Sequence, residues 1–337
     1  MNKVSLARLS LACLLLAGLV LSGCGRPEPT ATTAPPSPPP ESPLTGVSLS
    51  PKSFQAADFT DFFQKAAQAG DMVSWAGDWQ ELSSPNSGAN TVAGLAATYE
   101  YIPVLQLQFF KQASGQLLRP LEDATRQAYV SSAVAAVEKY KLNYLGVGIE
   151  VNILAAKSPP DFDDFTRLFE DVYNAVKAKS PDTKIFTIFQ LEVMKGLNGG
   201  LFGGVNDPAT AQWALLAKFP KSDLIAFTTY PGLIYGSPSA MPNDYYAEIR
   251  THTTKPVAFT EIGWHSSADP PGWESSEAEQ ADFVALFFER TEVLKPEFRI
   301  WSFLYDQGVP VPFHSMGLYR ADGNPKPAWD AWFSSTG

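Results

Sequence analysis

The stretch YLGVGIEVN, residues 144–152, is an apolar run that carries a single acid near its end. A helical pattern follows at 161–179, DFDDFTRLFEDVYNAVKAK, in which apolar residues such as Phe165 and Leu168 recur every three or four positions. A second apolar run, KIFTIFQL, comes next at 184–191. Strand, helix and strand in this order predict a parallel β-α-β unit.

The same alternation extends along the chain from residue 44. Strands are predicted at 45–50, 71–76, 102–109, 144–152, 184–191, 223–230, 256–262 and 298–305. Helical patterns between them include 121–141, 161–179 and 276–294. Eight such units predict an α/β fold with a single (β/α)8 TIM barrel over 44–337. A doubly wound open sheet is the alternative, but no Gly-rich phosphate-binding turn follows the first strand.

The N-terminus has the pattern of an export signal. Lys3 and Arg8 precede the apolar run LACLLLAGLVL at 11–21, which is shorter than the ~20 residues that span a bilayer. The overlapping LSGC at 21–24 resembles the lipobox of bacterial lipoproteins, and that resemblance implies that Cys24 is lipidated. We therefore expect 1–24 to be a lipoprotein signal peptide with its lipobox. An ordinary signal peptide with an incidental Cys24 is the alternative.

Residues 25–43, GRPEPTATTAPPSPPPESP, are rich in Pro, Thr and Ser, so they cannot build a core. They are expected to form an extended tether. Signal, lipobox and tether together predict an exported protein that is lipid-anchored to a bacterial membrane, at the cell surface or the periplasmic face.

Composition narrows the possible partners. The formal net charge of −10 disfavours nucleic acid and suits a neutral substrate. Cys13 and Cys24, both at the N-terminus, are the two cysteines, and there are three histidines. We therefore expect no metal site and no cofactor. The chain is expected to be a monomer.

Chemistry-bearing residues gather at the predicted strand ends, where barrel enzymes build their sites. Glu150 and Glu261 are the candidate catalytic residues. The candidate substrate-binding residues have aromatic or amide side chains: Trp75, Gln106, Gln108, Asn152, Gln190, Tyr230, Trp264, Trp301 and Tyr305. Flat aromatic faces beside amide and carboxyl groups suit a carbohydrate, which offers C–H faces and hydroxyl edges.

Strand periodicity predicts where the two acids point. Gly146, Gly148 and Glu150 would share one face of the run at 144–152. In the run at 256–262, Phe259 and Glu261 would also share a face, together with Val257. Both acids are therefore expected to point into the mouth of the barrel.

Four motifs, GIEVN (148–152), TTYP (228–231), FTEIGW (259–264) and IWSFLYD (300–306), make the sequence resemble clan A glycoside hydrolases. These are retaining (β/α)8 enzymes with one catalytic Glu after the fourth strand and another after the seventh. The last three motifs are similar to patterns in endo-β-1,4-galactanases and in some mannanases and β-glucanases. The resemblance implies hydrolysis of a poly- or oligosaccharide.

The same resemblance implies residue roles: Glu150 as acid/base, Glu261 as nucleophile, Tyr230 as hydrogen-bond donor to the nucleophile, and Trp301 or Tyr305 beneath the sugar. The chemistry needs one ionised and one protonated carboxyl ~5–5.5 Å apart, so their pKa values must be separated.

One position departs from the clan pattern, because Ile149 stands where most members have an Asn that contacts the substrate 2-hydroxyl. Asn152, expected on the same strand face as Glu150, is a candidate replacement. Two alternatives stay open: a barrel that binds glycan without cleaving it, and a sugar-binding lipoprotein of a transporter.

Overall fold

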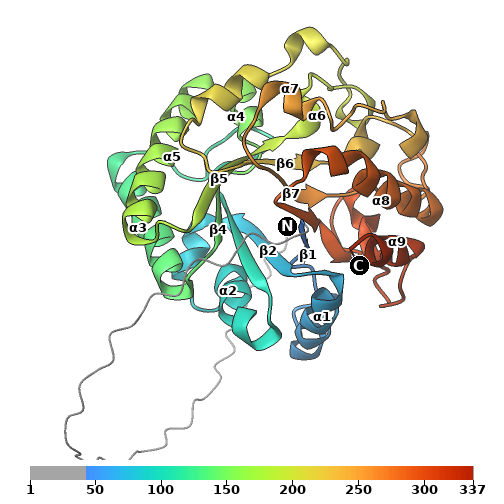
Figure 1. Ribbon diagram of the computed structural model, residues 1–337, viewed down its shortest axis with the longest axis horizontal. Coiled ribbons are helices and arrows are strands. Elements are labelled where there is room, and N and C mark those ends of the chain that lie inside the picture. The colour runs from blue at the N-terminus through green and yellow to red at the C-terminus, as the bar shows by residue number, and fades with distance from the viewer. Residues whose placement is uncertain (1–42, 337) are drawn as a thin grey trace, which may run out of the picture. The chain divides into compact units, whose positions relative to one another are not determined.

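The structure, a computed structural model, describes residues 43–336. Its strands close into one parallel barrel in sequence order, with helices around it (Figure 1). The barrel strands are β1 Leu44–Ser48, β2 Met72–Asp78, β3 Ile102–Gln108, β4 Tyr144–Val147, β5 Lys184–Gln190, β6 Ile225–Thr229, β7 Val257–Ile262 and β8 Phe298–Trp301. The predicted single (β/α)8 barrel is confirmed.

Long helices cover most of the barrel: α1 Ala56–Ala69, α2 Gly88–Tyr99, α3 Asp123–Tyr140, α5 Pro159–Lys179, α8 Glu277–Thr291 and α9 Pro327–Thr336. The connections after β4, β5 and β6 carry the short helices α4 Val151–Lys157, α6 Leu191–Met194 and α7 Ile249–His252. Short 3₁₀ helices also occur in the connections after β5 and β6, among them Gly200–Phe202 and Pro231–Leu233. These connections are therefore largely loops, which leaves room for a site.

Strand residues alternate between two apolar layers. The inner layer fills the barrel with Met72, Val104, Tyr144, Phe186, Ile188, Leu224, Ala226, Ala258, Phe298 and Ile300. The outer layer packs between strands and helices, as in the contact of Phe259 on β7 with Phe287 on α8 (ring centroids 5.1 Å apart). A parallel barrel buries both faces of its strands, so both layers are apolar.

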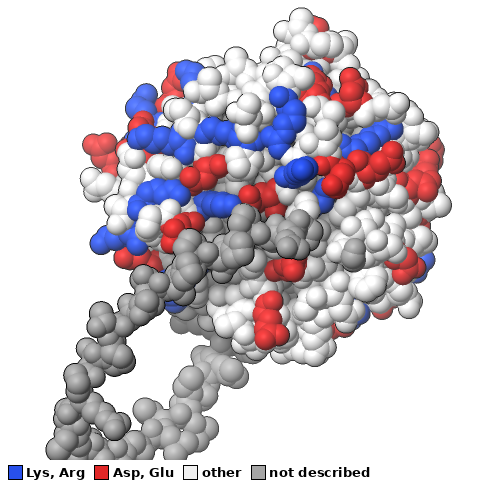
Figure 2. All heavy atoms as spheres, viewed as in Figure 1, with Lys and Arg blue, Asp and Glu red and all other residues white. Residues whose placement is uncertain are grey.

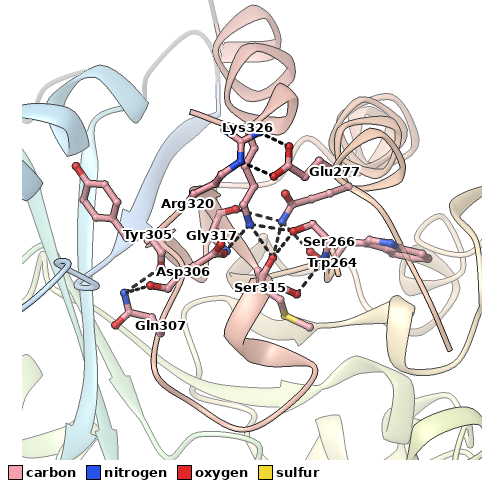
Figure 3. A network of polar contacts seen from close by, with 12 residues as sticks. Trp264, Ser266, Glu277, Tyr305, Asp306, Gln307, Ser315, Gly317, Arg320 and Lys326 are labelled. Atoms are coloured by element: carbon pink, nitrogen blue, oxygen red, sulfur yellow. Dashed lines mark hydrogen bonds and ion pairs between the residues drawn. The ribbon is translucent and has the colours of Figure 1, made fainter. Parts of the chain in front are cut away.

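The predicted strand 298–305 divides at Ser302 into β8 and β9 (Phe303–Tyr305), and β9 pairs in parallel with β10 (Gly317–Tyr319). The loop 306–316 between β9 and β10 is fixed at both ends by a buried lysine (Figure 3). Lys326 Nζ donates to Asp306 Oδ1 (2.6 Å) and to the Ser315 carbonyl (2.9 Å). Asp306 Oδ1 also accepts from the Gly317 amide at 2.9 Å.

The predicted signal peptide, Cys24 and most of the tether lie outside the described residues. Within residues 43–336 no helix has both the length and the apolarity that crossing a bilayer requires. On the face drawn in Figure 2, basic and acidic side chains lie side by side across the upper part, whereas the lower part of the described surface is mostly uncharged with scattered acidic side chains.

Candidate active site

A cavity of about 950 Å³ opens at the carboxyl ends of the barrel strands. Five of the residues predicted from the sequence line it: Gln108, Glu150, Gln190, Tyr230 and Glu261. The two candidate catalytic acids therefore share one cavity, with Tyr230 beside them.

Glu150 reaches the cavity by a sharp turn rather than by strand alternation. β4 ends at Val147, Gly148 has φ +80°, and Glu150 itself is left-handed (φ 56°, ψ 41°) just before α4. A Cβ on Gly148 would lie 2.4 Å from Phe165 Cζ, so glycine is required there. The left-handed conformation costs a non-glycine residue roughly 1–2 kcal/mol. Strain of this kind is concentrated at functional sites.

The predicted shared face of Gly146, Gly148 and Glu150 is therefore wrong, because the strand ends before the last two. The cavity is lined by Ile149 as well as by Glu150, although the two were expected on opposite faces. Asn152 lies on α4, not on a strand.

A β-bulge turns Glu261 inward. Phe227 on β6 pairs with Phe259 on β7, yet the next residue, Thr228, pairs with Glu261, so Thr260 is an extra residue. Val257 and Phe259 belong to the outer layer, whereas Glu261 lines the cavity. The expectation that these three share a face is wrong. The bulge, rather than regular alternation, brings Glu261 to the predicted place.

Glu261 is held by Tyr230. The phenol donates to Glu261 Oε2 at 2.6 Å, and its oxygen lies 2.9 Å from Ser302 Oγ. Burial raises the pKa of Glu261, and the Tyr230 hydrogen bond opposes that rise because it stabilises the carboxylate. The contact implied by the family resemblance is present.

Glu150 has the environment of a carboxylic acid that keeps its proton. Burial and then the charge of Glu261 raise its pKa to about 8. A hydrogen bond from Thr228 Oγ1 to Glu150 Oε1 (2.7 Å) partly opposes the rise, and the charge of Glu192 adds to it. Near neutral pH, Glu150 is therefore largely protonated.

Glu192 supports the site from behind, and it was not among the predicted catalytic or substrate-binding residues. It is fully buried and accepts hydrogen bonds from Tyr245 Oη (2.7 Å), Thr229 Oγ1 (2.9 Å) and the Tyr230 amide (3.2 Å) on Oε1, and from Gln190 Nε2 (2.6 Å) on Oε2. It thereby fixes the strand ends on which Gln190 and Tyr230 stand. Its position two residues after Gln190, at the end of an apolar run, was the available signal.

Two glutamines near the C-terminal end of β3 have buried amide atoms without partners. Gln106 is fully buried with neither amide atom paired, and Gln108 Oε1 is also buried without a partner. Buried amide atoms need partners, which water or a ligand can supply. The amide of Gln190 is already used, because it bonds Glu192 and the Val193 amide (2.6 Å).

Four aromatic side chains that were predicted to bind substrate do not line the cavity. Trp75, on β2, packs towards α2, where a Cβ on Gly88 would lie 2.5 Å from its Nε1. Trp264 donates to Ser275 Oγ (3.0 Å) and packs on Phe283 of α8. Their placement as sugar platforms is therefore wrong.

Trp301 and Tyr305 are likewise fully buried in the outer layer. Trp301 Nε1 donates to the Met316 carbonyl (2.8 Å), and the Tyr305 hydroxyl bonds Asp61 of α1. Asn152 is also excluded, because its amide bonds the Gln190 backbone (2.8 and 3.0 Å) and Gln212. The rings that do line the cavity, besides Tyr230, are Phe202, Phe303 and Phe313.

Across residues 43–336 no three His, Cys, Asp or Glu side chains converge in a way that could hold a metal ion. What the site does offer is an acid with a raised pKa, a second carboxylate supported by a phenol, and amides nearby. That set can transfer protons and attack an electrophilic carbon.

No family model matches this chain, and no curated protein matches it. Solved structures do. A family 39 glycoside hydrolase from Bacteroides cellulosilyticus WH2 is similar with a TM-score of 0.60 and 18% identity, over 87% of this chain and 63% of that one. This chain thus spans less than two thirds of that enzyme's length.

A GH5_18 protein from Streptomyces cattleya, solved in complex with Manb1-4GlcNAc, is similar with a TM-score of 0.63 and 16% identity, over 88% and 80% of the two chains. A psychrophilic family 10 endo-β-1,4-xylanase is similar with a TM-score of 0.59 and 12% identity, over 87% and 96%. At these identities the similarity establishes the fold, a (β/α)8 barrel also found in glycoside hydrolases.

Proposed function

We propose that this protein is a retaining glycoside hydrolase in which Glu150 is the acid/base and Glu261 the nucleophile. The observation that carries the proposal is one cavity holding two carboxyl groups in unlike environments. Burial and neighbouring charge raise the pKa of Glu150 to about 8, whereas Tyr230 donates a hydrogen bond that favours ionised Glu261. Burial raises the pKa of both acids, the charge of Glu261 adds to the rise at Glu150, and Tyr230 opposes the rise at Glu261. Environments that push two carboxyl pKa values apart in this way assign the higher one to the acid and the lower one to the nucleophile.

In the first step a Glu261 oxygen attacks the anomeric carbon, the bond to the leaving oxygen breaks, and Glu150 gives its proton to that oxygen. A glycosyl ester on Glu261 results. In the second step ionised Glu150 takes a proton from water, whose oxygen attacks the anomeric carbon and displaces Glu261. Two inversions leave the anomeric configuration retained.

The similar structures support the reaction class, since they are named as glycoside hydrolases, among them a xylanase. A carbohydrate substrate follows from the same proposal. Gln108 and Tyr230 line the cavity, and we propose that both contact the substrate. No cofactor takes part in these steps.

A glycan-binding barrel without catalysis is the second candidate, and Ile149 is the observation that favours it. Ile149 lines the cavity where most of the clan has Asn, and Asn152 cannot replace that Asn because its amide is occupied. A sugar-binding lipoprotein of a transporter would have two lobes, unlike the closed barrel found here.

Turnover separates these candidates. A panel of chromogenic glycosides and polysaccharides should include at least one that the wild-type chain hydrolyses. Glu261→Gln should abolish hydrolysis of every substrate, whereas Glu150→Gln should abolish it for poor leaving groups and spare the first step for nitrophenyl glycosides. Glu289→Gln, an exposed change on α8, is the control. Binding of a glycan without turnover of any substrate would contradict hydrolysis.

We also propose that the protein is exported, lipidated on Cys24 and held by residues 25–43 at a bacterial membrane as a monomer. Cys24→Ser should release it from membrane fractions or leave its precursor uncleaved. A correctly cleaved Cys24→Ser protein that still partitions with membranes would contradict the anchor, and a dimer in sedimentation would contradict the monomer.

A further inference from the structure

The floor and the rim of the cavity differ in chemistry. Glu150, Glu261, Tyr230 and Gln108 make the floor polar. The rim is formed by loops that follow β5 and β9, and its exposed members are Phe202 (43% exposed), Val309 (37%) and Val311 (47%). Large apolar side chains left in water beside a cavity are typical of a binding surface.

Exposed side chains of this type are few in the described chain, and they concentrate at this mouth. The set is Phe54, Phe202, Val205, Val293, Val309, Val311 and Phe333. Three of the seven line the cavity, and Val205 is in the same loop as Phe202. The apolar rim is therefore a local feature of the site, not the general character of the surface.

The apolar surface continues inward from the rim to the reacting groups. Phe303, Phe313 and Leu233 line the cavity below the exposed valines, and the Phe313 ring packs edge-on against Tyr230 at 5.3 Å. An apolar path thus leads from solvent to the phenol that holds Glu261.

The loop that carries Val309, Val311 and Phe313 is held in place. Its ends are joined by Lys326, which bonds both Asp306 and the Ser315 carbonyl (Figure 3). Pro310 lies between the two valines and also lines the cavity. A wall fixed in this way does not depend on a ligand for its position, which lowers the cost of binding.

The remaining polar lining is of limited use to a second sugar. Beyond the floor it consists of Gln112, Lys157, Asn198 and Gln190. Lys157 Nζ donates one of its three protons to the Ala113 carbonyl (2.6 Å), and the Gln190 amide is paired, so few polar groups remain there for a second sugar. A sugar along Val309, Pro310 and Val311 would place its hydroxyl groups against aliphatic side chains, which cannot bond them.

We infer that the substrate is a glycoside with an apolar leaving group, an alkyl or aryl aglycone that lies along the apolar rim while the sugar occupies the polar floor. The inference rests on the proposed hydrolase function. It specifies the class of substrate that the two glutamates cleave.

The test compares alkyl glycosides that share one sugar. A panel of nitrophenyl glycosides first identifies the sugar that the enzyme accepts, and each alkyl glycoside is used below its critical micelle concentration. Each methylene removed from water contributes roughly a fourfold gain, offset in part by lost chain freedom. We therefore expect kcat/KM for the octyl glycoside to exceed that for the methyl glycoside by on the order of tenfold to a hundredfold. The kcat/KM for the octyl glycoside should also exceed that for a disaccharide of the same sugar.

Matched variants locate the effect. The double change Phe202→Ser and Val311→Asn should bring the octyl-to-methyl ratio of kcat/KM close to one. Phe333→Ser and Val293→Asn change exposed side chains of the same types outside the cavity lining, so they should leave the ratio as in the wild type. Equal rates for octyl and methyl glycosides, or a disaccharide preferred over both, would overturn the inference while hydrolysis itself stands.

A binding arm keeps the two proposals separate. If no glycoside is hydrolysed, the proposed function fails, and calorimetric titration with octyl and methyl glucosides still tests the rim. Tighter binding of octyl glucoside by the wild type, lost in the rim double variant and kept in the control double variant, supports an apolar ligand. Equal binding of both glucosides, or octyl binding that the rim changes do not alter, overturns it.

Discussion

Tyr230→Phe removes one hydroxyl and leaves the ring in place, so it tests the hydrogen bond to Glu261. The Phe313 contact depends on the ring and should persist. The lost contacts are the 2.6 Å bond from the phenol to Glu261 Oε2 and the 2.9 Å contact with Ser302 Oγ. A hydrogen bond to a charged group contributes about 1.5–3 kcal/mol net, which corresponds to roughly tenfold to a hundredfold in rate.

The direction of the pH effect follows from the same contact. The phenol favours ionised Glu261, so its removal raises the pKa of Glu261. Because the nucleophile must be ionised, the acidic limb of the kcat/KM profile should move to higher pH. The basic limb reports protonated Glu150, whose pKa is about 8, and should change little.

The assay is kcat/KM for a nitrophenyl glycoside across both limbs, for wild type, Tyr230→Phe and Thr228→Val. Thr228 donates to Glu150 (2.7 Å), so its replacement should raise the pKa of Glu150 and move the basic limb to higher pH. An unchanged acidic limb in Tyr230→Phe, or the same limb moving in both variants, would refute the assignment of the two acids.

Three further predictions concern stability. Gly148→Ala adds a methyl 2.4 Å from Phe165 Cζ at a residue with φ +80°, and it should lower the free energy of unfolding by roughly 2–4 kcal/mol. Gly203→Ala, at φ +73° with open space around the added methyl, is the control and should cost about 1 kcal/mol. Equal losses for the two variants in urea unfolding would contradict the packing account. Lys326→Met leaves the half-buried Asp306 without its ion-pair partner and should cost about 3 kcal/mol, part of which Asp306→Asn added to it should restore; no recovery in the double variant would mean that the loss is not electrostatic. Glu150→Gln should raise the free energy of unfolding near pH 8 by about 1–3 kcal/mol, after allowance for the open cavity, and should raise it less near pH 5. The reason is that the folded-state pKa of Glu150 is raised to about 8, so the stability of the wild type falls as pH rises above the pKa of the unfolded chain. A difference in Tm between the variant and the wild type that does not depend on pH would contradict this.

The barrel was predictable from sequence because strand and helix periods alternate clearly along the chain. Strand ends were located within a few residues, and strand ends are what gather the site. Glu150 and Glu261 were found because an acid after an apolar run stands out regardless of which way the strand faces.

Side-chain direction was not predictable where both faces of a strand are apolar. In FRIWSFLY, at 298–305, Ile300 packs inside the barrel and Trp301 packs outside it. Both residues are apolar, so the sequence does not indicate which of them faces inward. Trp75 and Tyr305 were misplaced for the same reason. The bulge at Thr260 depends on pairing with β6, and the left-handed Gly148 lies against Phe165; both contacts involve residues distant in sequence.

Asn152 and Glu192 illustrate the role of neighbours in polar assignments. Asn152 was expected to bind substrate, yet its amide joins α4 to the Gln190 backbone. Glu192 supports Tyr230 and Gln190 through four donors that come from three segments of the chain. Only the assembled barrel shows which polar side chains remain free for a ligand.

The most direct measurement of the central claim traps the covalent intermediate. A Glu150→Ala chain incubated with a dinitrophenyl glycoside should gain the mass of one sugar, and peptide mapping should place that sugar on Glu261. Azide should then release a glycosyl azide with the anomeric configuration of the substrate. A sugar found on another residue, or an azide product of inverted configuration, would contradict double displacement through Glu261.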